Sequence, residues 1–187
     1  MTGTTNTSIW VNYKNGCRNF CGNTLREGYC KNEQLDEIII TPTTKDKNDK
    51  PISPTDIVSS GIMTKNEWDI CKKYSFLLFK YGQSIMSKKG LILVDTKYEF
   101  GKDKNGNILL IDEIHTPDSS RYWLKSSYNQ RFKTNLEPEN IDKDIIRKWI
   151  INNYDPYNLN IVINPPDSLI QETSDKYKQL FNIITSS

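Results

Sequence analysis

The segment from Thr64 to Lys89 constrains the fold more than any other part of the sequence. Thr64 is followed three residues later by Glu67, which is the capping-box pattern that begins a helix. Apolar residues then recur at helical spacing up to the lysines that precede a glycine. Residues 91–100 and 107–115 follow as two predicted strands. A long helix packed on a sheet predicts an α+β fold.

Three charged side chains fall on one face of the first predicted strand. Because side chains alternate between faces, Asp95, Lys97 and Glu99 line up together. A solvent-facing strand with a ladder of Lys and Glu would explain this pattern without a site, although Asp is disfavoured in strands. The opposite face is predicted to be buried and carries Ile92, Val94, Thr96, Tyr98 and Phe100.

Asn105-Gly106 lies between the two predicted strands and favours a two-residue hairpin turn, because both turn positions need positive φ. That turn would place Glu99 opposite Asp112 on the same face. Two opposed carboxylates repel each other unless positive charge lies between them. Lys97 could supply part of this charge, and Mg²⁺ is the sharper alternative because it binds carboxylate and phosphate oxygens. A longer turn would change this register.

The sequence TPDSSR after the second predicted strand contains an acid, two hydroxyls and an arginine within four residues. Arg121 is suited to bidentate recognition of a phosphate or a carboxylate, and the serines can donate to the same anion. The alternative is a turn in which Asp118 and the serines bond their own backbone. His115 lies just before this sequence, either as a base beside a site or simply as a polar residue at a strand end.

Composition narrows the class of function. A net charge of +2 provides no large field for nucleic acid or for a membrane surface. No apolar run approaches the roughly 20 residues of a membrane span. The four cysteines and the single histidine lack zinc-finger spacing, which predicts reduced thiols in a cytoplasmic protein.

Three further segments complete the organisation. Residues 43–54 are polar and predict an exposed loop, for which ligand binding would be a reason to become ordered. Residues 142–153 and 167–184 predict two helices.

Several segments together resemble one enzyme family. The sequences LILVDTKYEFG and IDEIHTPDSSRYW are similar to the paired signature of the SAICAR synthetases. IITPTTKDKNDKPIS resembles the family's polar loop before the long helix, and TGTTNTSIWVNYKNG resembles its Gly-Ser or Gly-Thr segment. DKDIIRKWI resembles the arginine-bearing helix that follows the signature. The resemblance runs from about Thr2 to Phe181, and four such segments in order are specific.

The resemblance implies an ATP- and Mg²⁺-dependent ligase of de novo purine biosynthesis. Such an enzyme joins L-aspartate to the carboxylate of carboxyaminoimidazole ribonucleotide. ATP would phosphorylate that carboxylate, and the aspartate amine would displace phosphate. The chemistry agrees, because a carboxylate at neutral pH forms an amide only after it acquires a leaving group. Cations directed at the transferring phosphoryl oxygens are then needed.

The resemblance also implies roles for individual residues. Glu99 and Asp112 correspond to the carboxylates that hold Mg²⁺ and the nucleotide. The residues implied in catalysis are Asp95, Lys97 and Arg121. The residues implied in substrate binding are Thr4, Lys45, Asp49, Asp118, Ser120, Arg121 and Arg147.

The resemblance implies one SAICAR-synthetase-like domain over residues 1–187, with a mixed sheet and packed helices. Residues 1–60 would form a substrate-binding segment and a mobile polar loop, and residues 61–187 the helix, the metal-site hairpin and the C-terminal helices. Most of the family's N-terminal nucleotide-binding β lobe is absent from the sequence, so a separate chain is expected to supply it. One alternative is a truncated, non-catalytic remnant that binds a ribonucleotide. Another is a kinase-like phosphotransferase, supported only by an acid after a hairpin.

Overall fold

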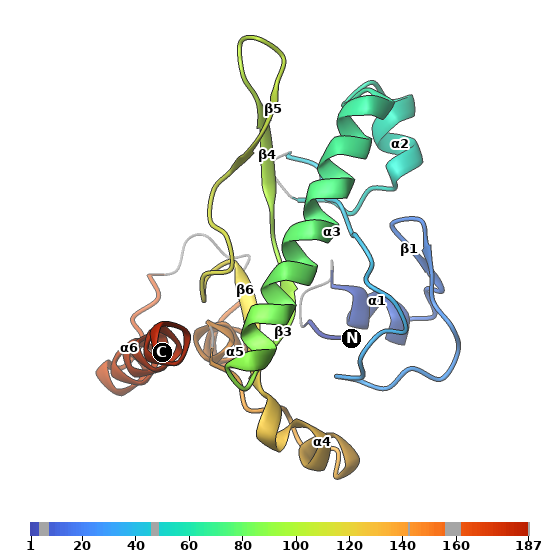
Figure 1. The fold of residues 1–187 in the computed structure, drawn as a ribbon. Helices are drawn as coiled ribbons and strands as arrows, with labels where there is room; N and C mark the ends of the chain where they lie inside the picture. Colours follow the sequence, from blue (N-terminus) through green and yellow to red (C-terminus); the bar gives the residue numbers. More distant parts are fainter. Residues whose placement is uncertain (4–7, 46–48, 142, 156–161, 187) are drawn as a thin grey trace. The chain divides into compact units, whose positions relative to one another are not determined.

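The structure, a computed structural model, describes residues 1–3, 8–45, 49–141, 143–155 and 162–186. It divides into two compact units, which we describe separately: residues 1–78 with 102–108, and residues 79–101 with 109–187. Helices and strands are mixed along the chain (Figure 1), which confirms the predicted α+β class. The elements are α1 Ile9–Lys14, β1 Asn19–Phe20, β2 Asn23–Thr24, α2 Pro54–Ser59, α3 Lys65–Lys88, β3 Leu91–Thr96, β4 Glu99–Lys102, β5 Ile108–Ile111, β6 Ser120–Leu124, α4 Lys125–Lys133, α5 Asp144–Asn153 and α6 Asp167–Thr185.

The long predicted helix is confirmed as α3, and its N-terminus has the predicted capping box. The backbone N–H of Thr64 donates to Glu67 Oε2 at 2.8 Å, and the N–H of Glu67 donates to Thr64 Oγ1 at 3.3 Å. Lys102 Nζ bonds the other carboxylate oxygen at 2.7 Å. The bond from Lys102, followed by those from Thr64, lowers the pKa of Glu67 to about 2. Gly90 follows the helix with φ +74°, a conformation that favours glycine.

The prediction of a single strand over residues 91–100 is wrong. This segment forms β3 and β4, which belong to different two-stranded sheets. β3 pairs antiparallel with β6, and β4 pairs with β5. The sequence of β6 overlaps the TPDSSR segment, where turn-forming residues concealed the strand signal.

A register shift in β3 corrects the predicted buried face. Leu93 is opposite Tyr122, whereas Asp95 is opposite Arg121, so Val94 is an extra residue on β3. Such a bulge changes the face on which the following side chains lie, and it allows Leu93 to be buried while Asp95 is exposed. The residues predicted to be buried are all only half-buried: Ile92, Val94, Thr96, Tyr98 and Phe100.

The hairpin turn is one residue longer than predicted. Asp103 N–H donates to Asn107 O at 3.0 Å, and Gly106 N–H donates to Asp103 O at 3.0 Å. Gly106 has φ +86°, as in a three-residue loop that ends in a left-handed glycine. Carried along the strands, this register places Glu99 opposite Ile111. The predicted direct pairing of Glu99 with Asp112 is therefore wrong.

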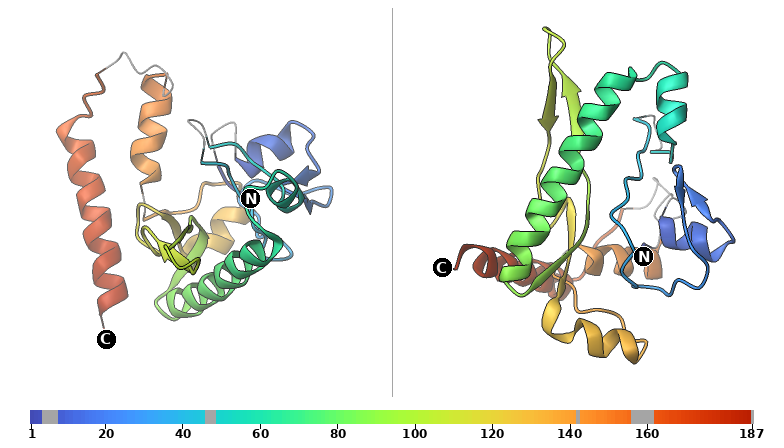
Figure 2. Two further views of the ribbon diagram at one scale, coloured as in Figure 1. Left: turned by 90° about the horizontal axis from the view of Figure 1, so that it is seen from above. Right: turned by 45° about the vertical axis from the view of Figure 1, so that its right-hand side comes forward.

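The unit that contains residues 79–101 and 109–187 has its own apolar core. α5 and α6 lie side by side (Figure 2), and both confirm predicted helices, although Asp142 lies outside the described residues. The core combines side chains from α3, both strands of the β3–β6 pair, the segment before α5, and α6. Its buried members are Met86, Leu91, Leu93, Tyr122, Ile141 and Leu180.

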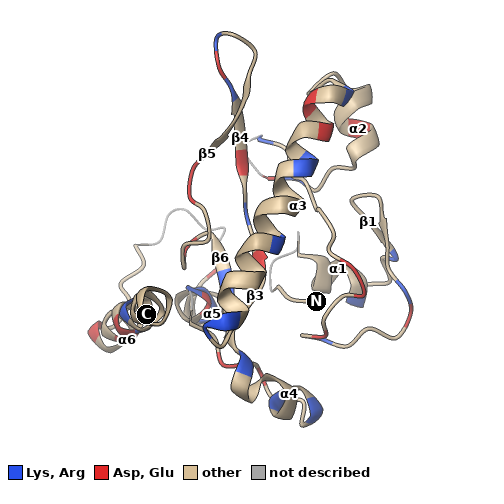
Figure 3. Ribbon diagram, viewed as in Figure 1, with Lys and Arg blue, Asp and Glu red and all other residues tan. Residues whose placement is uncertain are grey.

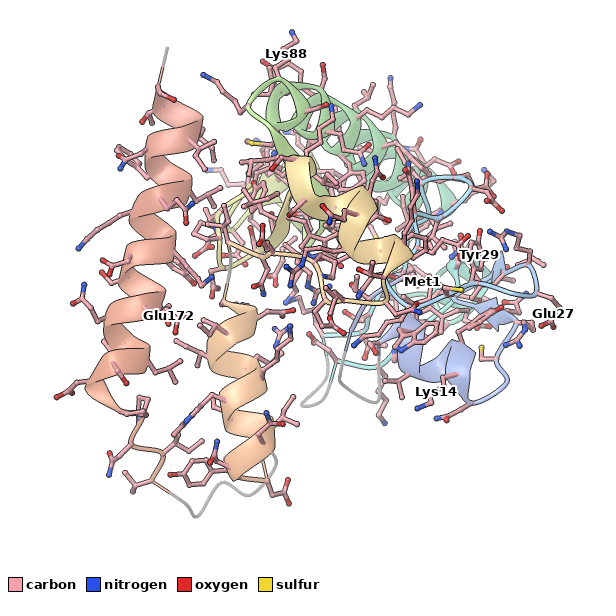
Figure 4. The ribbon with its side chains drawn as sticks, turned by 90° about the horizontal axis from the view of Figure 1, so that it is seen from below. Met1, Lys14, Glu27, Tyr29, Lys88 and Glu172 are labelled. Atoms are coloured by element: carbon pink, nitrogen blue, oxygen red, sulfur yellow. The ribbon has the colours of Figure 1, made fainter. Side chains whose placement is uncertain are left out.

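The other unit is built around an aromatic cluster near the N-terminus. Tyr13 of α1 packs edge-on against Tyr29, with ring centroids 5.9 Å apart. Figure 4 labels Met1 and Tyr29, two members of this cluster. In the same unit, the described residues on either side of 46–48 are exposed, as predicted for the polar loop. No helix in the described part of the chain is long and apolar enough to cross a membrane.

Replacing Leu93 with alanine is expected to lower the free energy of unfolding by about 2–5 kcal/mol, because the side chain is only 1% exposed and its removal leaves a cavity. Leu109→Ala is the matched control, because Leu109 is also in a strand but is 49% exposed. Its expected cost is about 0.5 kcal/mol or less. Urea denaturation of both variants measures the difference. Equal losses would contradict the placement of Leu93 in the core.

Candidate active site

A pocket of about 330 Å³ lies entirely within the second unit. Its walls come from β3, the β5–β6 connection, β6 and the start of α5, whose charged residues are marked in Figure 3. Acidic and basic side chains both line it, together with three hydroxyl groups. The lining residues are Asp95, Thr96, Lys97, Asp112, Glu113, Asp118, Ser119, Ser120, Arg121, Lys143, Asp144 and Arg147.

Arg121 lies between two carboxylates. Its NH1 is 2.5 Å from Asp95 Oδ2, and its Nε is 3.2 Å from Asp144 Oδ2. The register of β3 against β6 creates the first pair by placing Asp95 directly opposite Arg121. Only 13% of the Arg121 side chain is exposed, so these ion pairs are screened less than those on an open surface. The planar guanidinium is thus fixed in orientation.

Asp144 was missed in the sequence, and it joins the two pocket arginines. Besides Arg121, it accepts from Arg147 NH1 at 3.3 Å, one helical turn along α5. Its side chain is 16% exposed. The signal was present as an acid in the first helical turn, three residues before an arginine. It could not reveal the contact with Arg121, which is 23 residues away in sequence.

The connection that enters β6 combines both alternatives considered for the TPDSSR sequence. Thr116 N–H donates to Ser119 Oγ at 3.2 Å, so this hydroxyl does bond its own loop. Asp118 instead faces α5, where Lys143 Nζ lies 3.0 Å from its Oδ1. Ser120 is buried, and its Oγ lies 2.8 Å from Thr96 Oγ1 of β3. The segment is therefore a turn and a pocket wall at once.

Lys97 lines the pocket, and its Nζ lies 2.8 Å from Glu99 Oε1. Glu99 itself is not among the lining residues. The predicted row of three charges is thus divided, with Asp95 bound to Arg121 and Lys97 bound to Glu99. Every basic side chain of the pocket has a carboxylate partner.

Asp112 and Glu113 bring acidic side chains to the pocket from the end of β5. Asp112 has φ +66°, in the left-handed region. The Glu113 carboxylate accepts a hydrogen bond from the Thr116 hydroxyl. Among the described residues, no group of three or more His, Cys, Asp or Glu side chains could hold a metal ion. The donor set suits Mg²⁺ that is held by one carboxylate together with phosphate oxygens, and does not suit an all-protein cage.

The geometry of the pocket does not test three of the predicted substrate residues. Thr4 falls outside the described residues. Lys45 and Asp49 belong to the first unit, where both are exposed. Their roles stay predictions.

His115 is half-buried and does not line the pocket. Burial lowers its pKa below the ordinary value of 6.5, so the imidazole is neutral at pH 7. Burial also raises the pKa of Tyr98, which keeps that phenol protonated. The Tyr98 hydroxyl lies 2.5 Å from His115 Nε2 and therefore donates to it. A half-buried neutral ring that has a phenol hydroxyl on its Nε2 does not fit a base that acts on a substrate in this pocket.

A comparison of the sequence with known protein families identifies one family. Residues 2–162 match the SAICAR synthetase family. The chain belongs to this family.

Two relatives are similar over nearly the whole chain. The phosphoribosylaminoimidazole-succinocarboxamide synthase of Legionella pneumophila (strain Lens) is 48% identical over 186 residues, which cover 99% of this chain and 60% of that protein. The chloroplastic synthase of Arabidopsis thaliana is 50% identical over 188 residues, covering 100% of this chain and 46% of that protein. The chain thus spans about half of the length of such SAICAR synthetase relatives.

Solved structures of the family agree with the fold. The Saccharomyces cerevisiae SAICAR synthase complexed with SAICAR matches with a TM-score of 0.75 and 27% identity, covering 98% of this chain and 57% of that one. A type-2 SAICAR synthetase in complex with ADP matches with a TM-score of 0.55 and 30% identity, covering 87% and 55%.

Proposed function

We propose that this chain provides the substrate- and metal-binding part of a phosphoribosylaminoimidazole-succinocarboxamide synthase. The proposed reaction is the ATP-dependent ligation of L-aspartate to carboxyaminoimidazole ribonucleotide in the cytoplasm. The observation that carries the proposal is the charged pocket around Arg121, in a chain of the SAICAR synthetase family. The relatives bound to SAICAR and to ADP support a ribonucleotide and a nucleotide as its ligands.

The pairing of the pocket cations suggests how anionic substrates are recognised. The four basic side chains already have carboxylate partners: Lys97 with Glu99, Arg121 with Asp95 and Asp144, Lys143 with Asp118, and Arg147 with Asp144. A substrate phosphate or carboxylate must therefore displace an internal carboxylate from its basic partner, or share that basic side chain with it. The binding free energy is the difference between the two pairings, and this difference favours ligands with the correct geometry.

The proposed roles of individual residues combine the family resemblance with the lining of the pocket. Arg121 and Arg147 would bind substrate anions, with Asp118 and Ser120 at the rim of the pocket. Lys97 would lie near the reacting carboxylate, and Asp95 would hold Arg121 in orientation. Thr4, Lys45 and Asp49 are proposed as substrate-binding residues from the family resemblance alone.

Asp112 would hold a Mg²⁺ ion that enters with the nucleotide, because its carboxylate lines the pocket at the end of β5. When bound, Mg²⁺ supplies neutralisation of the charge on the transferring phosphoryl group. Glu99 is the second proposed ligand, and it would have to leave Lys97 to reach the ion.

Activity is proposed for this chain together with the nucleotide-binding lobe that the family resemblance implies, whether that lobe is on the same polypeptide or a separate one. We refer to that combination as the complete enzyme. Incubation with ATP, Mg²⁺, L-aspartate and carboxyaminoimidazole ribonucleotide is expected to give the succinocarboxamide, ADP and phosphate in equal amounts. Chromatography of the nucleotides measures all of the products except phosphate, which a colorimetric assay measures.

The alternative function is a non-catalytic remnant that binds a ribonucleotide. Calorimetric binding of the ribonucleotide without product formation by the complete enzyme would favour that alternative and contradict the proposal. Omission of aspartate is the matched control. ADP release that continues at the full rate without aspartate would also contradict ligation.

A further inference from the structure

The His115 side chain is seated against the backbone of α3. A Cβ atom placed on Gly82 would lie 2.3 Å from His115 Cε1 and 2.8 Å from Nδ1. Real Cβ contacts are essentially never so short, so only glycine at this position leaves room for the ring. Gly82 is buried inside the helix and has an ordinary helical φ, which means that its role is to permit close approach. All of the residues in this contact belong to the second unit.

Two tyrosines hold His115 from other directions. The Tyr98 hydroxyl is 2.5 Å from Nε2 of the ring, and the ring centroids are 5.6 Å apart. The Tyr122 hydroxyl donates to the backbone carbonyl of His115 at 2.5 Å. Tyr122 is fully buried in the core, so this second contact ties the His115 backbone to a rigid part of the unit.

The backbone around His115 requires such anchoring. His115 has φ +57° and Asp112 has φ +66°, so two non-glycine residues lie in the left-handed region within one short segment. Each costs free energy and persists only where the surrounding structure determines the conformation. The same segment includes Asp112 and Glu113, which both line the pocket.

We propose that His115 is a positioning residue, whose ring is seated on Gly82 so that the 112–115 segment presents the Asp112 carboxylate to the pocket. His115 acts through the backbone and touches none of the reacting groups. The consequence for Mg²⁺ and nucleotide rests on the proposed function. The anchoring of residues 112–115 does not, and it can be measured in the chain alone.

A double-mutant cycle of Gly82→Ala and His115→Gly tests the contact. Alanine inside a helix normally raises stability relative to glycine. Gly82→Ala is nevertheless expected to lower the melting temperature when His115 is present, because the new methyl group collides with the ring. In the His115→Gly background the same change is expected to raise it. Glycine accepts positive φ, so His115→Gly removes the ring without opposing the backbone conformation. The same sign of shift in both backgrounds would overturn the contact.

Hydrogen exchange measures the anchoring itself. Amides of residues 112–116 are expected to exchange at least about ten-fold faster in His115→Gly than in the unsubstituted chain, whereas those of α6 are expected to be unchanged. Tyr98→Phe removes only the hydroxyl group and is expected to give a smaller increase, which keeps the test available if Gly82→Ala does not fold. Unchanged exchange in both His115→Gly and Tyr98→Phe would overturn the proposal.

The functional readout is the Mg²⁺ concentration that gives half of the maximal rate in the complete enzyme. His115→Gly is expected to raise it by about ten-fold or more, as is typical when a residue that orients a metal ligand is lost. A merely structural role would reduce the active fraction and leave this concentration unchanged, which would also overturn the proposal. If the unsubstituted enzyme forms no product, the proposed function fails, and the exchange and melting experiments still decide the role of His115.

Discussion

Replacing Arg121 with lysine is expected to lower kcat/KM for the ribonucleotide by about 10²–10³-fold, although the positive charge is kept. Arg121 bonds Asp95 and Asp144 through different nitrogens of one planar group. A lysine ammonium is a single point charge and cannot reproduce both directions or a bidentate contact to a substrate anion. It would lose one of the two carboxylate contacts that Arg121 makes, at a cost of about 1–3 kcal/mol in stability. Steady-state kinetics and thermal melting measure the two effects.

Arg131→Lys is the matched control for this substitution. Arg131 lies in α4, outside the pocket, and also bonds a carboxylate, Glu139, with NH1–Oε1 at 3.4 Å. Its replacement is expected to leave kcat/KM within about two-fold of the unsubstituted value, because exposed ion pairs contribute little. Similar kinetic losses for the two substitutions would show that Arg121 has no special role in substrate binding.

Replacing Asp112 with asparagine is expected to weaken binding of Mg²⁺ with ADP by about 100-fold in the complete enzyme, because the substitution removes the negative charge from the proposed metal ligand. The backbone should tolerate the change well. Asn accepts the left-handed conformation that Asp112 adopts at φ +66°. The melting temperature without ligand is therefore expected to stay unchanged. Titration calorimetry with Mg²⁺ and ADP measures the effect.

The control is Asp175→Asn, which removes the same charge from an exposed position on α6. Binding is expected to be unaffected there. Unchanged binding in Asp112→Asn would remove Asp112 from the metal site. Glu99→Gln then separates the two proposed ligands, because Glu99 bonds Lys97 in the structure and does not line the pocket.

Local signals in the sequence predicted the three longest helices of this fold, α3, α5 and α6. The capping box at Thr64 and Glu67 depends only on residues three apart, and both of its hydrogen bonds are present. α5 and α6 likewise follow from apolar periodicity within each segment. Membership of the SAICAR synthetase family was predictable for a related reason, since its signatures are contiguous.

The strand pairing and the finer geometry of the site depend on residues far apart in sequence. The extra residue Val94 shifts β3 against β6 and brings Asp95 opposite Arg121. No local pattern in β3 reveals this bulge, because it arises from the pairing of two strands. The turn after Asp103 is longer by one residue than the Asn-Gly dipeptide suggested, which removed the predicted alignment of Glu99 with Asp112.

Asp144 shows the same limit within the pocket. It reads as an ordinary acid at a helix start, but in the structure it lies between Arg121 and Arg147. The importance of His115 could not be predicted from the sequence either. Its significance depends on the absence of a side chain at Gly82, which is 33 positions earlier.

In the proposed reaction, ATP activates the ribonucleotide carboxylate for attack by aspartate, and this chain contributes the anion-binding pocket. The most direct measurement uses a ribonucleotide in which both oxygens of the carboxylate are ¹⁸O. Transfer of the γ-phosphoryl group to a carboxylate oxygen, followed by formation of the amide bond, leaves that oxygen on the released phosphate. The complete enzyme is therefore expected to release one phosphate containing one labelled oxygen for each succinocarboxamide formed, as measured by mass spectrometry. Unlabelled phosphate accompanying the same product would contradict this account.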